Sequence, residues 1–463
     1  MPSIISNGIG SGLDISGIVQ QLVAAEGQPV ITRLGQQEAK VQARLSGFGS
    51  LKSALSDLRD KLDVMKDLDK FLSRKAVSGN EDKFTVTADT GAVPSSYSIE
   101  VVQLAEAQKL TSGAFSDTDA VIGTGKLTLQ IGVEGVTIDI NSENNTLAGI
   151  RDAINGSTDN PGIAATVVNA DSGSYLILTA QSTGAENSIK VTQSGGDGGL
   201  AALEYDPPNS TALTESIAAQ DGLIRVDGFD VLSKNNSFAG AVEGVTITAL
   251  ESTSGGTEKL TVENDAEAVQ DLVADFVESY NSLVATFDGL TDYDPDANIA
   301  APLLGDASVR GIRDQIRREL SVNVTDIGGP FSSLTDIGVE VQLDGTLSID
   351  EQALSDVLAS DFTDFGQLFA STDGFAVRLH GLTDGYLKSD GIVETRTQGL
   401  TDQIDGFSEQ ADALNERLTL LEARLLRQFN ALDSLLGQLS TTSNFLSQQL
   451  NNLPGFTPPG SNG

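Results

Sequence analysis

The stretch Leu400–Leu446, LTDQIDGFSEQADALNERLTLLEARLLRQFNALDSLLGQLSTTSNFL, places apolar residues at alternating steps of four and three. These positions are Leu400, Ile404, Phe407, Ala411, Leu414, Leu418, Leu421, Leu425, Leu432, Leu435, Leu439 and Leu446, and only Gln428 and Thr442 interrupt the phase. This period predicts a long amphipathic helix with one apolar seam.

The opposite end of the chain carries a matching pattern. Its apolar positions are Val41, Leu45, Phe48, Leu51, Leu55, Leu58, Leu62 and Met65, and the spacing slips once between Phe48 and Leu51. We expect one helix from about Asp14 to Glu26, ending before Pro29, and a longer one over roughly Val30–Leu72. The two ends can pair with each other within one chain, or with the helices of another chain.

From these patterns we predict a helical assembly seam. Its residues are Ile15, Ile18, Leu22, Leu45, Leu55, Leu62, Leu414, Leu418, Leu421, Leu425, Leu432, Leu435, Leu439 and Leu446.

Between the two helical ends the apolar period changes to two. From Lys75 onward, strands are predicted around Phe84–Ala88 and Tyr97–Val101, and strands and turns continue to about Val262. Helical periodicity returns at Ala266, and Asn264 and Asp265 before it are candidate caps. The predicted fold is therefore α+β and multidomain, with discontinuous helical domains from both termini and nested, mainly β domains inserted between them.

We expect four domains, each built from one or two segments. They are a terminal coiled-coil domain (1–40 with 435–463), a helical leg domain (41–76 with 263–434), a β head domain (77–114 with 216–262) and an outer β domain (115–215).

Composition excludes several classes of function. The chain has 463 residues and a formal net charge of -37, which opposes binding to nucleic acid or anionic membranes. There is no cysteine, so neither disulfides nor thiolate metal sites hold the fold. Residues 1–20 lack the features of a secretory signal peptide, and no run approaches the roughly 18 to 20 apolar residues of a membrane span, so membrane insertion is not expected.

No catalytic, cofactor or metal site is predicted. His380 is the only histidine and is flanked by Leu379 and Gly381, so we expect neither a multi-histidine metal site nor a histidine-assisted nucleophile within one chain. We interpret His380 as structural. The cluster Asp292, Asp294, Asp296 and Asn298 imitates the start of a calcium loop, but Pro295 replaces a flexible position and no closing Glu follows. We therefore expect no enzyme activity and no cofactor.

Several motifs, in order along the chain, resemble one bacterial family. The first is Gly8–Asp14 (GIGSGLD), and a block at 146–187 with Ile154-Asn155 and Thr183–Asn187 (TGAEN) is similar to a repeat of flagellin and hook-associated proteins. Further matching segments are Asp221–Gly228, Asn235-Asn236, Gly244–Thr246, Tyr280–Leu283, Leu304–Ala307, Ser333–Gly338 and Asp344–Ser348. Together they resemble the flagellar filament cap family, also called flagellar hook-associated protein 2.

The resemblance implies a structural function at the distal tip of the bacterial flagellar filament. In that family a homo-oligomeric ring forms a plate that promotes the folding and insertion of flagellin. The implied partners are flagellin, the hook-filament junction protein and a cytoplasmic export chaperone on the C-terminal helix. The chain would be secreted by the flagellar export apparatus.

Two alternatives belong to other classes. A surface adhesin would bind mucin or other glycans through the β domains, with Tyr175 and Tyr205 as the main aromatic candidates. A flagellin or junction protein would polymerise into the shaft, but the early β insert and the order of the motifs argue against it.

Overall fold

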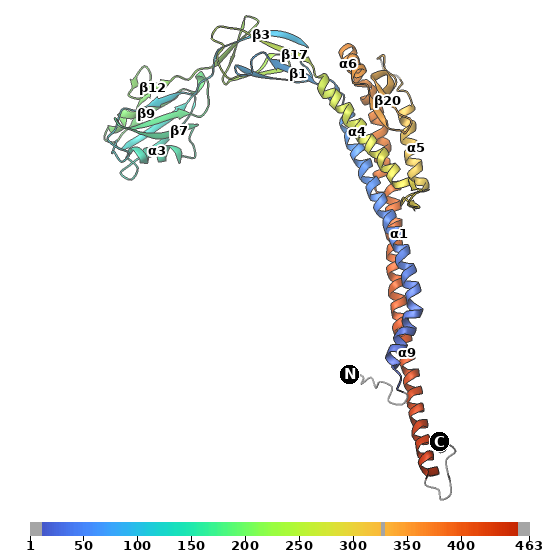
Figure 1. Ribbon diagram of the computed structural model, residues 1–463. Helices are drawn as coiled ribbons and strands as arrows, with labels where there is room; N and C mark the ends of the chain where they lie inside the picture. Colours follow the sequence, from blue (N-terminus) through green and yellow to red (C-terminus); the bar gives the residue numbers. More distant parts are fainter. Residues whose placement is uncertain (1–11, 326–328, 452–463) are drawn as a thin grey trace. The chain divides into compact units, whose positions relative to one another are not determined.

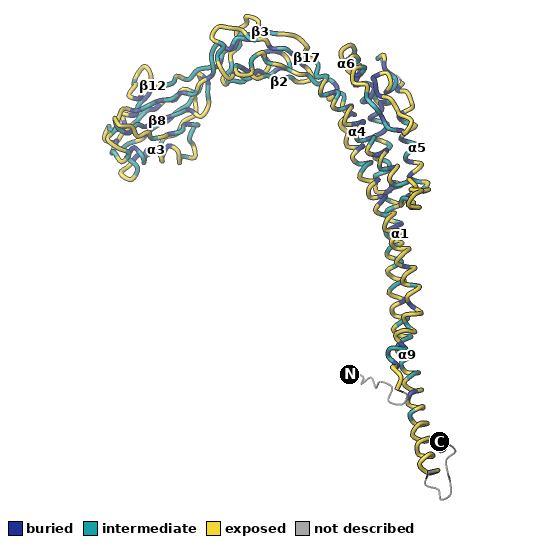
Figure 2. Tube along the Cα trace, viewed as in Figure 1, coloured by how far each residue is buried: buried dark blue, intermediate teal, exposed yellow. Residues whose placement is uncertain are grey.

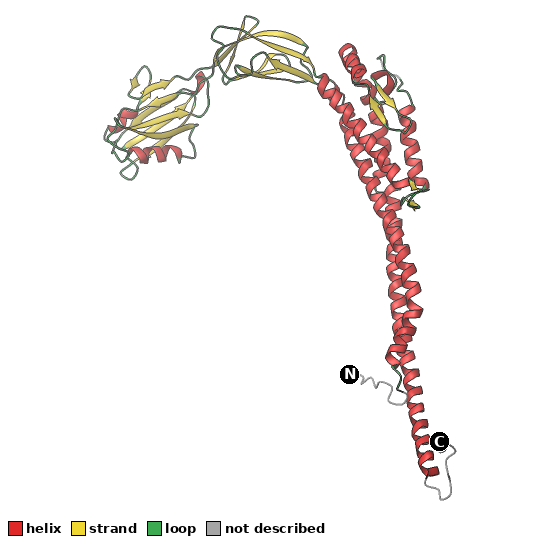
Figure 3. Ribbon diagram, viewed as in Figure 1, coloured by secondary structure: helices red, strands yellow, loops and turns green. Residues whose placement is uncertain are grey.

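A computed structural model describes residues 12–325 and 329–451. The chain divides into two compact units. The helical unit contains the chain up to Asp67, Asp271–Val357 and the chain from Gln367 onward; the β unit contains Leu68–Gln270 and Leu358–Gly366. The predicted α+β fold, with helices from both ends and β structure inserted between them, is confirmed (Figures 1 and 3). The division into four domains stays a prediction.

The helical unit is dominated by two long helices, α1 (Ile15–Met65) and α9 (Ile392–Asn451). Shorter helices complete a bundle around the second half of α1. They are α4 (Ala266–Thr291), α5 (Ala307–Ser321), α6 (Glu351–Phe365), α7 (Gln367–Ala370) and α8 (Phe375–Leu387), with α4 beginning and α6 ending in the β unit. Two small hairpins, β18–β19 (Tyr293–Asp294, Ile299–Ala300) and β20–β21 (Val339–Val341, Leu347–Ile349), and the 3-10 turn η3 (Leu334–Ile337) connect them.

Helix α1 corrects two predictions. The expected break before Pro29 is absent, because Pro29 lies inside one continuous helix. Proline removes one helical hydrogen bond and crowds the preceding turn. Here the helix is held against α9 at this level, since Gly27 lies against Leu418 and Glu26 pairs with Arg417 at 2.9 Å. The helix also ends at Met65 instead of Leu72, and a separate short helix, α2 (Leu68–Phe71), follows.

Other predicted element ends are confirmed. Asp14 is the N-cap of α1, and its carboxylate accepts a hydrogen bond from the Gly17 N–H at 3.0 Å. Asp265 precedes α4, and its carboxylate accepts from the Ala268 N–H at 3.1 Å. Both use a side-chain oxygen to satisfy an amide that has no partner within the helix.

The β unit has an inner part with two sheets. A five-stranded antiparallel sheet has the order β1-β17-β3-β13-β14, and a three-stranded sheet has the order β15-β16-β2. Phe84, Ile99 and Ile247 lie in the buried core that these sheets share. The strands are β1 (Arg74–Ser78), β2 (Phe84–Ala88), β3 (Ser95–Gln103), β13 (Gly222–Val226), β14 (Phe229–Ser233), β15 (Ser237–Val242), β16 (Val245–Ala249) and β17 (Glu258–Asn264).

The outer part of the β unit also has two sheets, β11-β10-β9-β5-β6 and β12-β4-β8-β7, together with helix α3 (Leu147–Asn155). Leu147, Ile150 and Ile154 recur along α3 and are buried in the core of this part. Thr146 caps the helix by accepting a hydrogen bond from the Gly149 N–H. The strands are β4 (Lys109–Thr111), β5 (Gly125–Ile131), β6 (Glu134–Ile140), β7 (Ile163–Ala170), β8 (Gly173–Ala180), β9 (Ile189–Ser194), β10 (Tyr205–Asp206), β11 (Ser210–Thr211) and β12 (Thr214–Ile217).

The Thr183–Asn187 turn joins the outer part to the inner part. The Ala185 N–H donates to the Asp221 carboxylate at 2.8 Å. Gly184 has a φ of +105°, and a Cβ there would lie 2.7 Å from the carbonyl oxygen of Lys234. This turn therefore needs glycine both for its backbone conformation and for the close approach of the two parts.

We predict that Gly184→Ala destabilises the β unit more than Gly162→Ala does. Both glycines have a positive φ, but a Cβ at Gly162 would meet open space. The control therefore carries only the conformational cost, about 1–3 kcal/mol, whereas Gly184→Ala adds the clash with Lys234. Urea unfolding followed by circular dichroism in the β-sheet region measures the difference. Equal losses of free energy of unfolding would show that the turn makes no close junction.

Candidate functional site

The two ends of the chain meet in the helical unit as an antiparallel pair of helices, α1 and α9 (Figure 1). Arg417 of α9 forms an ion pair with Glu26 of α1 at 2.9 Å. Farther along, Lys52 of α1 forms an ion pair with Glu394 of α9 at 2.7 Å. We call α1 from Ile15 to Leu45, together with α9 from Leu400 to Leu446, the leg. This region differs from the predicted helical leg domain (41–76 with 263–434).

A seven-residue repeat runs along α1. The buried residues at this interval are Gly27, Leu34, Val41, Phe48, Leu55 and Leu62. A strict interval of seven keeps one edge of a helix facing its partner in an antiparallel pair. At Gly27 the helices lie so close that a Cβ would be 2.6 Å from a methyl carbon of Leu418.

The leg has a thinner seam than the bundle. Between Phe48 and Met65 every apolar seam position of α1 is buried, but between Ile15 and Leu45 the buried side chains are only Ile15, Val19, Leu34 and Val41. Figure 2 shows this change along the helix pair. Two helices alone cannot enclose a wide apolar face, so the leg leaves apolar side chains at its surface.

The residues of the predicted assembly seam fall into three groups. Those that are buried are Ile15, Leu55, Leu62 and Leu414. Those that are half-buried are Ile18, Leu45, Leu418, Leu421 and Leu425. Those that are exposed are Leu22, Leu432, Leu435, Leu439 and Leu446.

The exposed leucines of α9, which are the exposed group without Leu22 of α1, form the strongest candidate interface. Leu436, Phe445 and Leu450 are also exposed and lie in the same last stretch of α9. A contiguous apolar helix surface of this kind marks a site of interaction with another protein. Whether the seam acts in assembly stays a prediction.

The part of the seam between Leu22 and Val41 was not predicted from the sequence. Leu34 and Gly27 were not recognised as seam positions, because Pro29 suggested a helix break. The interval of seven that links Gly27, Leu34, Val41 and Phe48 continues through the proline, and it could have identified this part of the seam.

His380 of α8 is half-buried against α1. A ring nitrogen lies 3.2 Å from the Asp63 carboxylate, and the Lys66 ammonium lies 3.3 Å from the ring. Burial lowers the pKa of His380, and the Lys66 charge lowers it further. The side chain thus has structural neighbours on α1 and just after it.

The acidic loop Asp292–Asn298 uses its polar side chains within its own turn. The Asp294 carboxylate accepts the N–H groups of Asp296 at 2.9 Å and Ala297 at 3.0 Å. The Tyr293 hydroxyl donates to the Asn298 side chain at 2.7 Å. Among residues 12–325 and 329–451, no group of three or more histidine or carboxylate side chains is placed to hold a metal ion.

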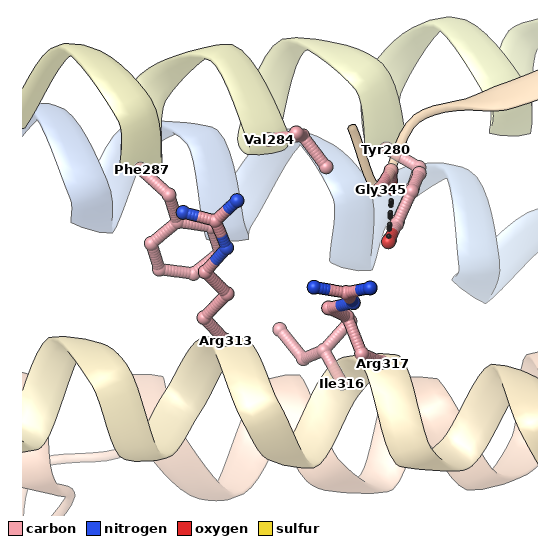
Figure 4. A pocket seen from close by; sticks show the side chains of 7 residues that line it. All are labelled: Tyr280, Val284, Phe287, Arg313, Ile316, Arg317 and Gly345. Atoms are coloured by element: carbon pink, nitrogen blue, oxygen red, sulfur yellow. Dashed lines mark hydrogen bonds between the residues drawn. The ribbon is translucent and has the colours of Figure 1, made fainter. Parts of the chain in front are cut away.

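A small cavity lies inside the bundle between α4 and α5 (Figure 4). Tyr280 and Phe287 line it on α4, and Arg313 and Arg317 on α5. Its volume of about 10 Å³ holds at most one water molecule. The Tyr280 hydroxyl donates to the Gly345 carbonyl at 2.9 Å, so the cavity is a packing feature and offers no room for a substrate.

The two tyrosines considered for glycan binding do not form an open aromatic surface. Tyr205 is buried in the outer core. Tyr175 is half-buried, and its hydroxyl is hydrogen-bonded to Ser172 at 2.8 Å. A strongly exposed aromatic ring belongs to Phe229 instead, beside the turn that joins β13 to β14.

Comparison with protein families gives two matches. Residues 11–108 match the family described as "Flagellar hook-associated protein 2 N-terminus", and residues 219–441 match "Flagellar hook-associated protein 2 C-terminus". The motif resemblance is therefore confirmed at both ends of the chain.

Similar proteins align over nearly the full length. The A-type flagellar hook-associated protein 2 of Pseudomonas aeruginosa is 34% identical and aligns over 97% of this chain and 98% of its own. Flagellar hook-associated protein 2 of Escherichia coli K12 is 32% identical and aligns over 98% and 99%. The crystal structure of the flagellar cap protein FliD D1-D2-D3 domains from Escherichia coli matches with a TM-score of 0.66 and 31% identity, over 77% of this chain and 99% of that one.

Helices that could span a bilayer are absent from the described part of the chain, since none combines the necessary length and apolar character.

We predict that Gly27→Val loosens the leg, whereas Gly35→Val does not. Both glycines lie in α1, but a Cβ at Gly35 meets nothing within 4 Å. Overpacking against Leu418 costs about 1–3 kcal/mol. Hydrogen exchange should therefore quicken for amides of Ile15–Leu45 in the Gly27 variant alone. Equal exchange in both variants would contradict the close helix contact.

We predict that the lone histidine makes the helical unit sensitive to acid. The pKa of His380 is lowered in the folded chain, so the unfolded chain binds this proton first as the pH falls. The contribution of His380 to the free energy of unfolding is fully present above the ordinary histidine pKa of about 6.5. This contribution is lost as the pH falls through the lower pKa that His380 has in the folded chain. The free-energy difference between the wild type and His380→Gln, measured by urea unfolding, should therefore shrink from pH 8 to pH 5. If this free-energy difference is the same at pH 8 and pH 5, protonation of His380 is not coupled to unfolding.

Proposed function

The chain belongs to the flagellar hook-associated protein 2 family, whose matched crystal structure is that of a flagellar cap protein, and we propose that it caps the distal end of the bacterial flagellar filament. Copies of the chain form a ring. Their β units make up a plate, and their legs reach the newest flagellin subunits. Flagellin that arrives unfolded folds beneath the plate and is inserted into the filament.

The observation that carries this proposal is the exposed apolar end of α9. Leu435, Leu439 and Leu446 lie on a well-formed helix but remain open to water. Burying one leucine side chain is worth about 1.5–3 kcal/mol. A chain with several such residues gains stability only when another subunit covers them, as the tip of a growing filament would.

The β unit is suited to contacts that form and break. Several of its ion pairs are solvent-exposed, for example Lys126 with Asp139 and Lys234 with Glu186. Exposed pairs of this kind contribute about 0–1 kcal/mol each. A plate held by many weak contacts can release one neighbour while others hold, which stepping on a growing filament requires.

The site chemistry supports a structural function instead of catalysis. His380 is engaged by Asp63 and Lys66 inside the bundle, and the carboxylates of the acidic loop serve its own turn. The bundle cavity beside Tyr280 is too small for a substrate. The long helices α1 and α9 and the exposed apolar residues of α9 are features that suit assembly with other subunits.

Export to the filament tip completes the proposal. The chain passes through the flagellar export apparatus, and the first cap contacts the hook-filament junction protein. A cytoplasmic chaperone covers the apolar end of α9 before export, since an uncovered leucine face would associate prematurely.

We predict that Leu439→Asp with Leu446→Asp abolishes capping in a flagellated bacterium that lacks its own copy of this gene. Two carboxylates on the apolar face oppose burial, so the strain should release flagellin into the medium and lose swimming motility. Ser440→Asp with Ser447→Asp is the control, because it has the same spacing and charge one position away along the exposed helix. Immunoblots of the exported variants verify that both are secreted.

Full motility of the leucine variant would refute the assigned interface. Retention of polymerised flagellin in a strain without the gene would refute the capping function itself.

A further inference from the structure

The charges of the leg are sorted by helix. Between Leu400 and Arg417, helix α9 contains five carboxylates and no lysine or arginine. These residues, here called the acidic stripe, are Asp402, Asp405, Glu409, Asp412 and Glu416, and all five are exposed. Their steps of three and four place them along one line of the helix surface.

Helix α1 carries the opposite charge at the same level. Arg33, Lys40 and Arg44, here called the basic stripe, are all exposed, and Glu38 is the one acid between them. Two ion pairs, Glu26 with Arg417 and Lys52 with Glu394, fix which segments of α1 and α9 lie opposite each other. Between these pairs, the segments that contain the two stripes run side by side.

Neither stripe is neutralised within the chain. In the part of the chain that the structure describes, none of these eight side chains takes part in an ion pair, although Glu26 and Arg417 at the next level do. Phe407 lines the same groove as Lys40 and Arg44, whereas Asp405 and Glu409 are two positions from Phe407 and so lie on the opposite face of α9, which places the two stripes on different sides of the leg. Like charges three or four residues apart repel one another along a helix, as the five carboxylates do and as Lys40 and Arg44 do, so each stripe is stabilised by a partner of the opposite sign.

The basic stripe also borders a groove. Lys40, Val41 and Arg44 of α1 line it together with Phe407 of α9 and Pro302 from the loop after β19. Its volume is about 490 Å³, enough for several side chains of a second molecule. Val41 is buried at the seam, so the two cations stand beside an apolar floor. This groove suits a helix face that is acidic.

We infer that the basic stripe and its groove receive the acidic stripe of a second copy of this chain. This inference rests on the proposed function, because it assigns the contact between neighbouring legs in the ring. One copy presents both halves of the contact on different sides. The contact is thus heterologous, and each copy can bind one neighbour on either side.

Charge complementarity selects the second copy as the occupant. The chain has a net charge of -37, so two copies repel each other in most orientations. When two copies meet so that the carboxylates on α9 of one copy lie beside Lys40 and Arg44 of the other, the local interaction is attractive. Exposed charge pairs give orientation and reversible contact more than affinity, and salt weakens them.

Charge reversal in the full-length chain tests the contact. Lys40→Glu with Arg44→Glu, or Asp405→Lys with Glu409→Lys, should each raise the concentration at half-assembly at least tenfold, measured by light scattering. Mixing the two variants, or combining all four substitutions in one chain, should restore assembly because the reversed charges attract again. Lys70→Glu with Lys259→Glu is the control for net charge, since both lysines are exposed on the β unit.

Cysteine cross-linking tests the direction of the contact, because the chain has no cysteine of its own. The full chain with Lys40→Cys and Glu409→Cys should give a ladder of disulfide-linked species beyond the dimer under oxidation. Each single cysteine variant should give at most a dimer.

Two outcomes would overturn the inference. Rings whose half-assembly concentration shifts less than twofold in both reversal variants would place the contact elsewhere while leaving the ring intact. A double-cysteine chain that gives no disulfide-linked species under oxidation, at concentrations where the wild type assembles, would also reject it. The flagellin-release assay decides the capping function independently of either result.

Discussion

The helical unit depends on the antiparallel contact between α1 and α9. The two helices come from opposite ends of the chain, and Glu26 and Arg417 are 391 residues apart in sequence when they meet. The seven-residue repeat from Gly27 to Leu62 sets the register of that meeting. Helices α4 to α8 pack around the second half of α1. A shift of α1 against α9 by one residue would therefore displace the side chains that hold the whole bundle together.

Several short motifs that carried the family resemblance have a structural explanation. Asn281 hydrogen-bonds both the N–H and the carbonyl oxygen of Leu347, which fastens strand β21 to α4. Asp306 caps α5 by accepting the Ser308 N–H at 2.8 Å. Asp336 accepts from the Ser332 and Ser333 N–H groups and closes the turn before β20. These residues hold a bundle in place, and they leave recognition to its outer surface.

The sequence predicted the fold well where one period dominates. Alternation around Phe84 and Ile99 identified strands, and the heptads of α9 identified a helix that continues to Asn451. Pro29 misled because a local rule on helix breaking does not include the partner helix that holds α1 straight. The candidate site shows the same limit of local patterns. Leu414 is buried and Leu435 is exposed, although both follow the same heptad pattern. Which leucines of α9 are buried depends on where the partner helix α1 begins, and the pattern of α9 does not contain that information.

The topology also imposes an order in time. In a chain that travels through a narrow channel from its N-terminus, α1 emerges first and its partner α9 emerges last. The β unit lies between them and can fold as soon as its own residues are free, which shortens the loop that the two ends must close. The leg forms only when the final helix arrives, so its closure reports that translocation is finished. Under the proposed capping function, a subunit built in this way would become competent to join its neighbours only when it leaves the channel.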